Sequence, residues 1–462
     1  MFTISFSDDK PLYEQLYTYI REQIERGNIC SGEKLPSKRM LSAHLKISVV
    51  TVETAYSLLA AEGYIYSKPG SGYYAENLPG AFRKRKTDKP ILSTAHSKRE
   101  FSIDFSTNRV DTTLFPFSIW AKLSREILSS GGKELLSTCS GKGVLALRQA
   151  IGDYLRDYRG MDVHPEQIIV GAGSEYLTGL LIQLLGRDMC YGVEDPGYVK
   201  THLVFSANCT SVLPIEVDGS GARLDSLVSL GIQIAHITPS HHFPLGTVMP
   251  AARRHEMLSW AYSAPDRYII EDDYDSDFRL YGKPVPTLQS LDCSSHVVYL
   301  NTFTKSLAPS MRIGYMVIPP DLLDRFEEKL GFYACTVPVF DQLILTEFIK
   351  RGFFERHISR MRKLYISRRN YFIDSLKNSP LSNILDIKGA DAGMHLLLRS
   401  KNGMREAELI KMAADEDVRV YGLSEYYSFG TNKDEGRIIV GYSGMSTQEI
   451  SRGISALERA WL

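Results

Sequence analysis

The sequence predicts two domains of different class: a small helical domain with a β-hairpin, followed by a larger α/β domain. Apolar residues recur at helical spacing near the N-terminus, whereas the later chain alternates buried strands with helices. The 462 residues exceed one ordinary domain, and 44% hydrophobic content supplies ample material for cores. We place the first domain at residues 1–77, a linker at 78–100 and the second domain at 101–462.

The first helix is predicted from an apolar stripe near the N-terminus. The segment PLYEQLYTYIREQIERG carries apolar residues at helical spacing, which predicts an amphipathic helix that ends near Gly27. The residues of this stripe are Leu12, Leu16, Ile20 and Ile24.

Two further helices are predicted from serine residues at their N-termini. Ser37 in LPSKR is expected to cap a helix that runs to about Leu45, and Ser48 to cap the helix VVTVETAYSLLAAEG, which Gly63 ends. In this third helix four residues are expected to face inward: Val52, Ala55, Leu58 and Leu59.

A hairpin completes the N-terminal domain. GYIYSKPGSGYYAEN, residues 63–77, predicts two short strands around a Pro-Gly-Ser-Gly turn. Three helices followed by a small hairpin form a winged helix-turn-helix. The segment also resembles the DNA-binding domain of the GntR regulators, whose pattern of PLY-x-Q, LPS-x-R, S-x-x-TV, EGY and GSG is present in full. The resemblance implies binding to double-stranded operator DNA, with the helix that begins at Ser48 in the major groove.

At one position that would contact DNA, this chain departs from the pattern of the family. The family commonly places arginine directly after the serine of S-x-x-TV, whereas Val49 stands there in this chain. Contacts at that position must therefore come from elsewhere, or the target sequence differs. The alternative interpretation is a solvated helical face. The residues expected to contact DNA are Ser37, Lys38, Arg39, Ser48, Thr51 and Lys68.

The predicted linker is basic. Residues 78–100 carry seven basic and two acidic side chains and lack periodicity, which is typical of a flexible linker. Its RKRK at 83–86 can add phosphate contacts, and a solubilising tether is the alternative.

In the larger domain, Lys305 lies in a polar loop, and carboxylate, hydroxyl and guanidinium side chains stand before and after it in the sequence. NTFTKSLAPSMRIGY, residues 301–315, predicts a strand end, a polar loop with one lysine and a second apolar strand, and RYIIEDDYD, residues 267–275, predicts a buried strand that ends in carboxylates. A lysine amine can form a Schiff base with a carbonyl. Pyridoxal phosphate bound in this way also needs a carboxylate for its ring nitrogen and cations or hydroxyls for its phosphate. The neighbourhood supplies these groups as Asp272, Tyr274, Thr302, Thr304, Lys305 and Arg312.

From about Phe101 to the C-terminus the chain resembles the fold-type I aminotransferase domain, an α/β fold with a mainly parallel sheet and a small C-terminal α/β subdomain. The resemblance implies that Lys305 forms the Schiff base and that Asp272 keeps the pyridine nitrogen protonated. It also implies that Tyr274 hydrogen-bonds the ring hydroxyl and that Tyr198 in EDPGYVK stacks on the ring. The phosphate would be held by Arg312, Thr302, Thr304 and the backbone N–H groups of Ser174 and Glu175 at a helix N-terminus.

The joining of a GntR-type reader to an aminotransferase-like domain resembles the MocR subfamily of GntR regulators over essentially the whole chain. This resemblance implies that the large domain is a pyridoxal-phosphate-dependent sensor. It also implies a head-to-tail homodimer in which each DNA reader docks against the partner's large domain.

The effector is not determined by these motifs. Aminotransferases hold the substrate carboxylate with an arginine late in the chain, but Ile439 stands at that position. Arg437 lies on the same strand face and can serve if the register shifts, or Lys200, at a position that is arginine in some relatives responding to gamma-aminobutyrate, can supply a point charge. Thr138 also replaces a tyrosine that reaches across the dimer to the phosphate in many relatives. The effector therefore stays open between an unusual amine or amino acid and pyridoxal phosphate itself.

Three functions fit these observations. The chain can be a transcriptional regulator with a cofactor-dependent sensor, an active aminotransferase with an appended DNA-binding arm, or a cofactor-free interaction protein. The isoleucine at the clamp position disfavours the second, and the intact lysine, aspartate, tyrosine and arginine set disfavours the third. We expect no net turnover and at most a residual aminotransferase-type half-reaction.

Composition excludes several other classes. The net charge is zero, and the six cysteines form no C-x-x-C pair, which argues against structural zinc or a disulfide framework. The histidines show no metal-binding spacing, so no metal site is expected. The N-terminus MFTISFSDDK lacks a signal peptide pattern, and no run approaches a membrane span. We expect a cytoplasmic protein without a membrane partner, nucleoid-associated when bound to DNA.

Overall fold

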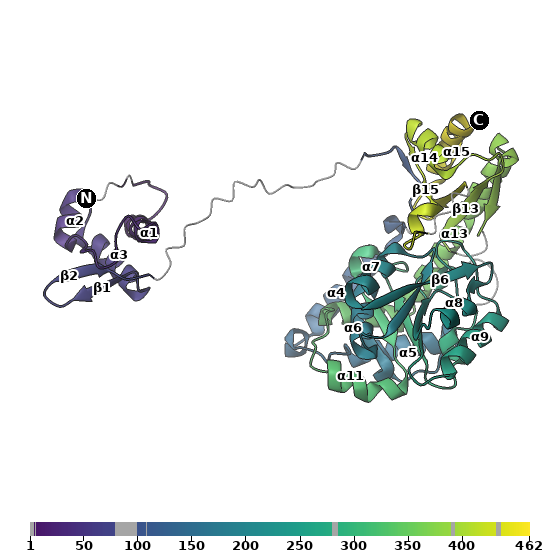
Figure 1. Cartoon of the computed structure of the whole chain (residues 1–462), viewed down its shortest axis with the longest axis horizontal. Helices are drawn as coiled ribbons and strands as arrows, with labels where there is room; N and C mark the ends of the chain where they lie inside the picture. Colours follow the sequence, from purple (N-terminus) through teal and green to yellow (C-terminus); the bar gives the residue numbers. More distant parts are fainter. Residues whose placement is uncertain are drawn as a thin grey trace. The chain divides into compact units, whose positions relative to one another are not determined.

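The computed structural model describes residues 4, 6–78, 99–107, 109–279, 285–389, 393–430 and 436–462. The chain divides into two compact units, Met1–Lys98 and Arg99–Leu462, which are drawn in Figure 1. Most of the linker predicted at 78–100 lies outside the described residues. No helix of the described residues is long and apolar enough to cross a membrane.

The N-terminal unit has the predicted three helices and wing. The Oγ atom of Ser37 accepts a hydrogen bond from Met40 N at 3.2 Å, and that of Ser48 accepts one from Thr51 N at 3.0 Å. Both serines therefore cap helices, as predicted. The elements are α1 (Leu12–Glu25), α2 (Lys38–Leu45), α3 (Val49–Ala61) and the antiparallel strands β1 (Ile65–Lys68) and β2 (Gly72–Ala75).

One predicted core position of this unit is wrong. Leu58, which was expected to face inward, is 38% exposed. The buried residues of α3 instead follow the spacing i, i+3, i+4 and i+7, so that Tyr56 replaces Leu58 on the inner face. The Tyr56 hydroxyl donates to the Pro36 carbonyl at 2.9 Å, which satisfies the polar end of a buried ring.

The larger unit is built on an eight-stranded sheet in the order β4-β11-β10-β9-β8-β5-β6-β7. The neighbours from β10 through β6 pair in parallel, whereas β11 with both its neighbours and β7 with β6 are antiparallel. The sheet is therefore mainly parallel, as predicted. Its strands are β4 (Ile168–Gly171), β5 (Cys190–Asp195), β6 (Ser211–Asp218), β7 (Gly221–Ala222), β8 (Ile234–Ile237), β9 (Tyr268–Asp272), β10 (Val297–Thr302) and β11 (Gly314–Val317).

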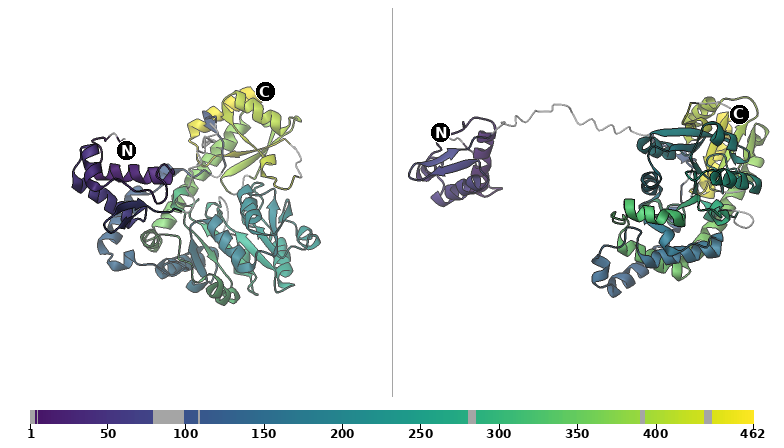
Figure 2. Two further views of the ribbon diagram at one scale, coloured as in Figure 1. Left: turned by 60° about the vertical axis from the view of Figure 1, so that its left-hand side comes forward. Right: turned by 60° about the horizontal axis from the view of Figure 1, so that its bottom comes forward.

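Alternate residues of these strands pack into separate cores on the two faces of the sheet. Tyr299 belongs to one core, whereas Val298 and Leu300 belong to another. Figures 1 and 2 show the surrounding helices. They are α4 (Phe117–Ser130), α5 (Leu145–Arg159), α6 (Ser174–Leu185), α7 (Val199–Asn208), α8 (Leu224–Ser229), α9 (Ala251–Tyr262), α10 (Leu288–Leu291), α11 (Leu323–Leu330), α12 (Val339–Lys350) and α13 (Phe353–Lys377).

A smaller C-terminal part has its own antiparallel sheet in the order β12-β13-β16-β15. The first strand of the larger unit, β3 (Ile103–Asp104), also lies in this C-terminal part, because it pairs in parallel with β14 (Val418–Arg419). The remaining elements are β12 (Leu385–Lys388), β13 (His395–Ser400), α14 (Glu406–Asp415), β15 (Tyr421–Gly422), β16 (Arg437–Gly441) and α15 (Thr447–Trp461).

The Ser48 cap gives a stability prediction for the reader. Ser48→Ala leaves the Thr51 N–H without its acceptor, so the N-terminal unit should lose about 1 kcal/mol of unfolding free energy. Hydrogen exchange of the α3 amides should become roughly fivefold faster. Ser57→Ala, at an exposed position inside the same helix, is the control and should not speed exchange. Unchanged exchange in Ser48→Ala would mean that the cap contributes no stability.

Candidate functional site

A cavity of about 370 Å³ lies at the C-terminal edge of the large sheet. Four neighbouring strands, β5, β8, β9 and β10, end at this edge, where open α/β sheets bind their ligands. Every residue predicted to bind the cofactor lines the cavity, and so does Lys200. The predicted residues brought together are Ser174, Glu175, Tyr198, Lys200, Asp272, Tyr274, Thr302, Thr304, Lys305 and Arg312.

Lys305 follows β10 and is largely enclosed by the cavity wall. Burial lowers the pKa of Lys305 to about 8, because an ammonium loses its hydration there. The carboxylates of Asp275 and Asp272 oppose this shift, whereas the charge of Lys200 adds to it. The amine is therefore uncharged in a much larger fraction of molecules near neutral pH than that of an exposed lysine.

One end of the cavity gathers groups that suit an anion. Gly173, just before α6, has a φ of +92°, and a Cβ there would lie 2.7 Å from Arg312 Nη2, so the turn requires glycine. Arg312 donates to the Ala172 carbonyl at 3.3 Å. The backbone N–H groups of Ser174 and Glu175 lie in the first turn of α6, where the helix supplies no acceptors. This end therefore combines a cation with unsatisfied donors.

The Glu175 side chain changes the charge of this end. Its carboxylate pairs with Arg312, and it also lies 3.7 Å from Lys200 Nζ. Glu175 therefore neutralises part of the positive charge at both residues. An anion that binds Arg312 has to displace this carboxylate.

Two hydroxyls adjoin the same end. The Oγ1 atoms of Thr302 and Thr304 lie 2.6 Å apart, and Thr302 Oγ1 also lies 3.1 Å from the Ile313 carbonyl. The two side chains are held in place by one another and by the backbone carbonyl of Ile313, which directly precedes β11.

The cavity lining contains two ionisable residues that the motifs did not identify, His236 and Glu194. His236 Nε2 lies 3.5 Å from Asp272 Oδ2. Glu194 accepts hydrogen bonds from Thr238 N at 3.0 Å and Thr238 Oγ1 at 2.6 Å, and burial raises its pKa to about 7. The available signal for Glu194 was a carboxylate at the end of a buried strand, four residues before Tyr198.

A histidine fixes the Tyr274 hydroxyl. His241 Nδ1 lies 3.1 Å from Tyr274 Oη and 2.8 Å from Asp275 Oδ2. Burial and the neighbouring carboxylates raise the pKa of Tyr274 well above its ordinary value. The phenol therefore stays protonated and oriented.

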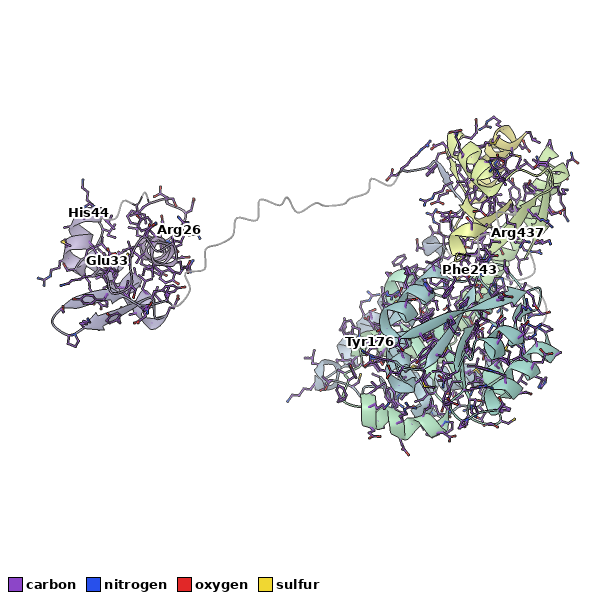
Figure 3. The ribbon with its side chains drawn as sticks, viewed as in Figure 1. Arg26, Glu33, His44, Tyr176, Phe243 and Arg437 are labelled. Carbon is purple, nitrogen blue, oxygen red and sulfur yellow. The ribbon has the colours of Figure 1, made fainter. Side chains whose placement is uncertain are left out.

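The wall toward the small sheet is aromatic and lacks the expected arginine. The Phe243 ring lies 5.9 Å from the Tyr198 ring, in an edge-on arrangement. Ile439 is fully buried in a separate apolar cluster, and Arg437 on β16 is not among the cavity-lining residues. Figure 3 labels Phe243 and Arg437 near the junction with the small sheet. Arg312 is the one arginine among the described lining residues, so the effector role of Arg437 stays a prediction.

In the N-terminal unit, Lys38 is engaged within the protein. Its Nζ lies 2.5 Å from Glu53 Oε1 and 5.5 Å from the centre of the Tyr73 ring. The hydrogen bond to Glu53 raises the pKa of Lys38. This ion pair ties α2 to α3 and occupies the ammonium that was predicted to contact DNA.

The other residues predicted to contact DNA differ in their exposure and in their hydrogen bonds within the protein. Arg39 is exposed, and Lys68 is exposed above the Tyr74 ring at 4.7 Å. Ser37 and Ser48 use their hydroxyls as caps, and the Thr51 Oγ1 lies 2.8 Å from Ser48 Oγ. The start of α3 also presents two exposed valines, Val49 at 42% and Val50 at 69%.

Each of the two units matches a known protein family. The bacterial regulatory protein model of the gntR family matches residues 12–74, and the aminotransferase class I and II model matches residues 102–457. The uncharacterized HTH-type transcriptional regulator YdeL of Bacillus subtilis (strain 168) is 40% identical, covering 98% of this chain and 97% of that protein. The probable rhizopine catabolism regulatory protein MocR of Rhizobium meliloti is 33% identical, covering 100% and 96%.

A solved structure supports the fold of the larger unit. Kynurenine aminotransferase of Pyrococcus horikoshii, in complex with PMP, superimposes with a TM-score of 0.69 at 24% identity, covering 79% of this chain and 91% of that one. Together with full-length relatives that are regulators, these matches show that the chain belongs to the GntR family of HTH-type transcriptional regulators, in the MocR type that carries an aminotransferase class I and II domain.

Proposed function

We propose that this regulator binds pyridoxal phosphate at Lys305 and that a small amine, an amino acid or the cofactor itself alters its binding to operator DNA. One observation carries the proposal: a largely enclosed lysine of lowered pKa shares a cavity with a carboxylate at one end and an anion site at the other. The full-length relatives favour a regulator over an active aminotransferase with an appended arm.

The anion end fits the phosphate of the cofactor. Arg312 and the first N–H groups of α6 would bind the phosphate oxygens, because charged donors and a helix N-terminus favour a dianion. Thr302 and Thr304 supply hydroxyls beside them. Glu175 would release Arg312 at this step, since its carboxylate repels a phosphate.

The other end fits the pyridine ring. Asp272 would hold the proton of the ring nitrogen, with His236 behind it at 3.5 Å. Tyr274 would donate to the ring hydroxyl, and Tyr198, 47% exposed at the start of α7, would stack on the ring. When bound, the cofactor supplies a carbonyl that reacts with amines and a ring that withdraws electrons. The donor set therefore suits this group over its whole length.

Retention of the ligand, rather than turnover, is supported by the missing clamp. Efficient transamination requires the substrate carboxylate to be fixed so that one C–H bond is aligned with the ring system. No arginine other than Arg312 is available among the described lining residues. Lys200 offers a single point charge on a side chain that is 63% exposed, which can attract a carboxylate without fixing its orientation.

A homodimer is part of the proposal. Several apolar side chains of the larger unit are strongly exposed: Phe117 and Leu128 on α4 at 70% and 63%, Leu136 at 92% and Phe332 at 79%. Such exposed apolar side chains support contact with another protein surface, here a second copy in the head-to-tail arrangement implied for this type of regulator.

DNA recognition is proposed through the winged helix-turn-helix. GntR-type regulators bind DNA, and the exposed Arg39 and Lys68 offer charge to phosphates or base edges. The exposed Val49 and Val50 offer methyl groups, which suit contact with thymine methyls in the major groove. Binding to chromosomal DNA would place the protein in the cytoplasm.

The lowered pKa of Lys305 predicts pH-dependent reactivity. In cofactor-free protein, acetylation of Lys305 by acetic anhydride should rise with pH and level off above about 8. Competitive labelling followed by peptide mass spectrometry measures this. Lys305 binds its proton more tightly in the unfolded chain than in the folded protein. The free energy of unfolding of the cofactor-free protein should therefore increase as the pH rises from about 8 to 10.5. A labelling midpoint near 10.5 would contradict the burial argument.

Cofactor attachment is tested by replacing the lysine. Lys305→Ala should lack the visible absorption band of wild-type protein mixed with pyridoxal phosphate, and borohydride should not fix the cofactor to it. Lys200→Ala is the matched control: it should keep the band and lose roughly tenfold in affinity for carboxylated amines. If wild-type protein shows no band with added cofactor, the proposed sensor is wrong.

DNA binding is tested at Arg39. Arg39→Ala should weaken operator binding by roughly 1–3 kcal/mol if the side chain meets a base edge. If it meets phosphate only, affinity should fall similarly on all sequences and the salt slope should flatten by about one unit. Arg26→Ala removes the same charge from an exposed residue paired with Glu22, and should leave binding nearly unchanged. If Arg39→Ala and wild type bind the upstream region of the gene equally well, the DNA-contacting residues have been assigned to the wrong segment of the chain.

A further inference from the structure

Two cysteines far apart in the sequence lie close together near the turn between β4 and α6. Cys139 lies in the segment between the short 3₁₀ helix Lys133–Leu136 and α5, and Cys335 lies between α11 and α12. Both are half-buried, and both side chains contact the same residue, Gln342. Neither belongs to the groups proposed to hold the cofactor.

A buried glutamine holds the two sulfurs together. Gln342 on α12 is fully buried, and its Nε2 lies 3.4 Å from Cys335 Sγ and 3.7 Å from Cys139 Sγ. The same nitrogen donates to the Val337 carbonyl at 2.8 Å, and Gln342 Oε1 accepts from Val144 N at 2.7 Å. With its amide anchored at both ends, Gln342 directs an N–H toward the sulfurs, which stabilises a thiolate.

We propose that Cys139 and Cys335 form a reversible intramolecular disulfide in the presence of a peroxide, and that this crosslink weakens cofactor binding. The second part of the proposal rests on the proposed function, whereas the first part does not. The disulfide would make the cavity responsive to oxidants as well as to its ligand.

The chemistry has two steps. The Cys139 thiolate attacks one peroxide oxygen, the O–O bond breaks, and the leaving alkoxide or hydroxide takes a proton, which leaves a sulfenic acid on Cys139. The Cys335 sulfur then displaces hydroxide from that sulfenic acid, and its own proton completes a water molecule. Each sulfur is oxidised by one electron and the peroxide is reduced by two. Burial raises the pKa of Cys335 to about 11, which disfavours the Cys335 thiolate as the group that attacks the peroxide.

The crosslink is coupled to the anion end through the residue after Cys335. Thr336 Oγ1 accepts a hydrogen bond from Ala172 N at 3.0 Å. The Ala172 carbonyl in turn accepts from Arg312 at 3.3 Å. The Cys335 thiol also donates to the Val170 carbonyl at 3.5 Å, a contact that the disulfide removes. Drawing Cys335 toward Cys139 therefore disturbs the turn between β4 and α6 that presents donors to the phosphate.

The disulfide is tested on the full chain by peptide mapping. Reduced protein, freed of reductant, is treated with hydrogen peroxide, its remaining thiols are blocked with N-ethylmaleimide, and the digest is analysed by mass spectrometry. We expect one crosslinked pair joining Cys139 to Cys335, about 2 Da lighter than the two thiol peptides and reversed by dithiothreitol. Cys139→Ser and Cys335→Ser should each abolish it. Cys190→Ser, at another half-buried cysteine, should leave it intact.

The mapping of wild-type protein can overturn the disulfide without any variant. If Cys139 and Cys335 still react fully with N-ethylmaleimide at peroxide doses that oxidise the exposed Cys293, the disulfide does not form and the proposal fails. A crosslink that joins either cysteine to a different partner has the same consequence.

The effect on the cofactor is measured by titration with pyridoxal phosphate, followed by its visible band. Oxidised wild-type protein should bind about fivefold more weakly than reduced protein, and dithiothreitol should restore the affinity. Peroxide should leave the affinity of Cys335→Ser unchanged. Equal affinities of oxidised and reduced wild type would overturn the coupling, while a band missing from both would overturn the proposed cofactor binding and leave the mapped disulfide standing.

Discussion

The parallel register of β9 with β10 is the constraint on which the candidate site depends. In that register Leu300 pairs with Asp272, so the carboxylate lies beside the point where β10 runs out into Thr302 and the loop of Lys305. A slip of one residue would turn Asp272 to the opposite face of the sheet and remove the carboxylate from the cavity. Residues 33 positions apart in the sequence thus become neighbours through backbone hydrogen bonds, and the low local dielectric then lowers the lysine pKa.

Much of this arrangement could be predicted from the sequence, because its signals are local. Ser37 and Ser48 cap helices with their own side chains, and such caps are recognisable from a few adjacent residues. The strand-end position of Lys305 follows from an apolar run that stops at a polar loop, and that lysine does line the cavity together with all its predicted partners. The roles of these residues toward the cofactor remain predictions, since their placement alone does not test them.

The features that could not be predicted from the sequence depend on contacts between segments that are distant in the chain. No local sequence pattern indicates such contacts. Lys38 has the composition of a phosphate contact, but a glutamate on the next helix occupies its ammonium. Leu58 has the hydrophobicity of a core residue, but the phase of α3 selects Tyr56, whose hydroxyl finds a backbone carbonyl. Cys139 and Cys335 are unremarkable in the sequence and become neighbours through the fold, with α12 supplying the amide between them.

Glu175 couples the proposed phosphate site at Arg312 to the proposed effector site at Lys200. Its carboxylate is shared between Arg312 and Lys200. A phosphate that takes Arg312 leaves this carboxylate to Lys200 alone, which strengthens that pair and reduces the charge that Lys200 offers to an effector carboxylate. An amine without a carboxylate would escape this competition. Because coupling between two sites is reciprocal, a carboxylated effector that binds Lys200 would likewise return Glu175 toward Arg312 and weaken the hold on the phosphate.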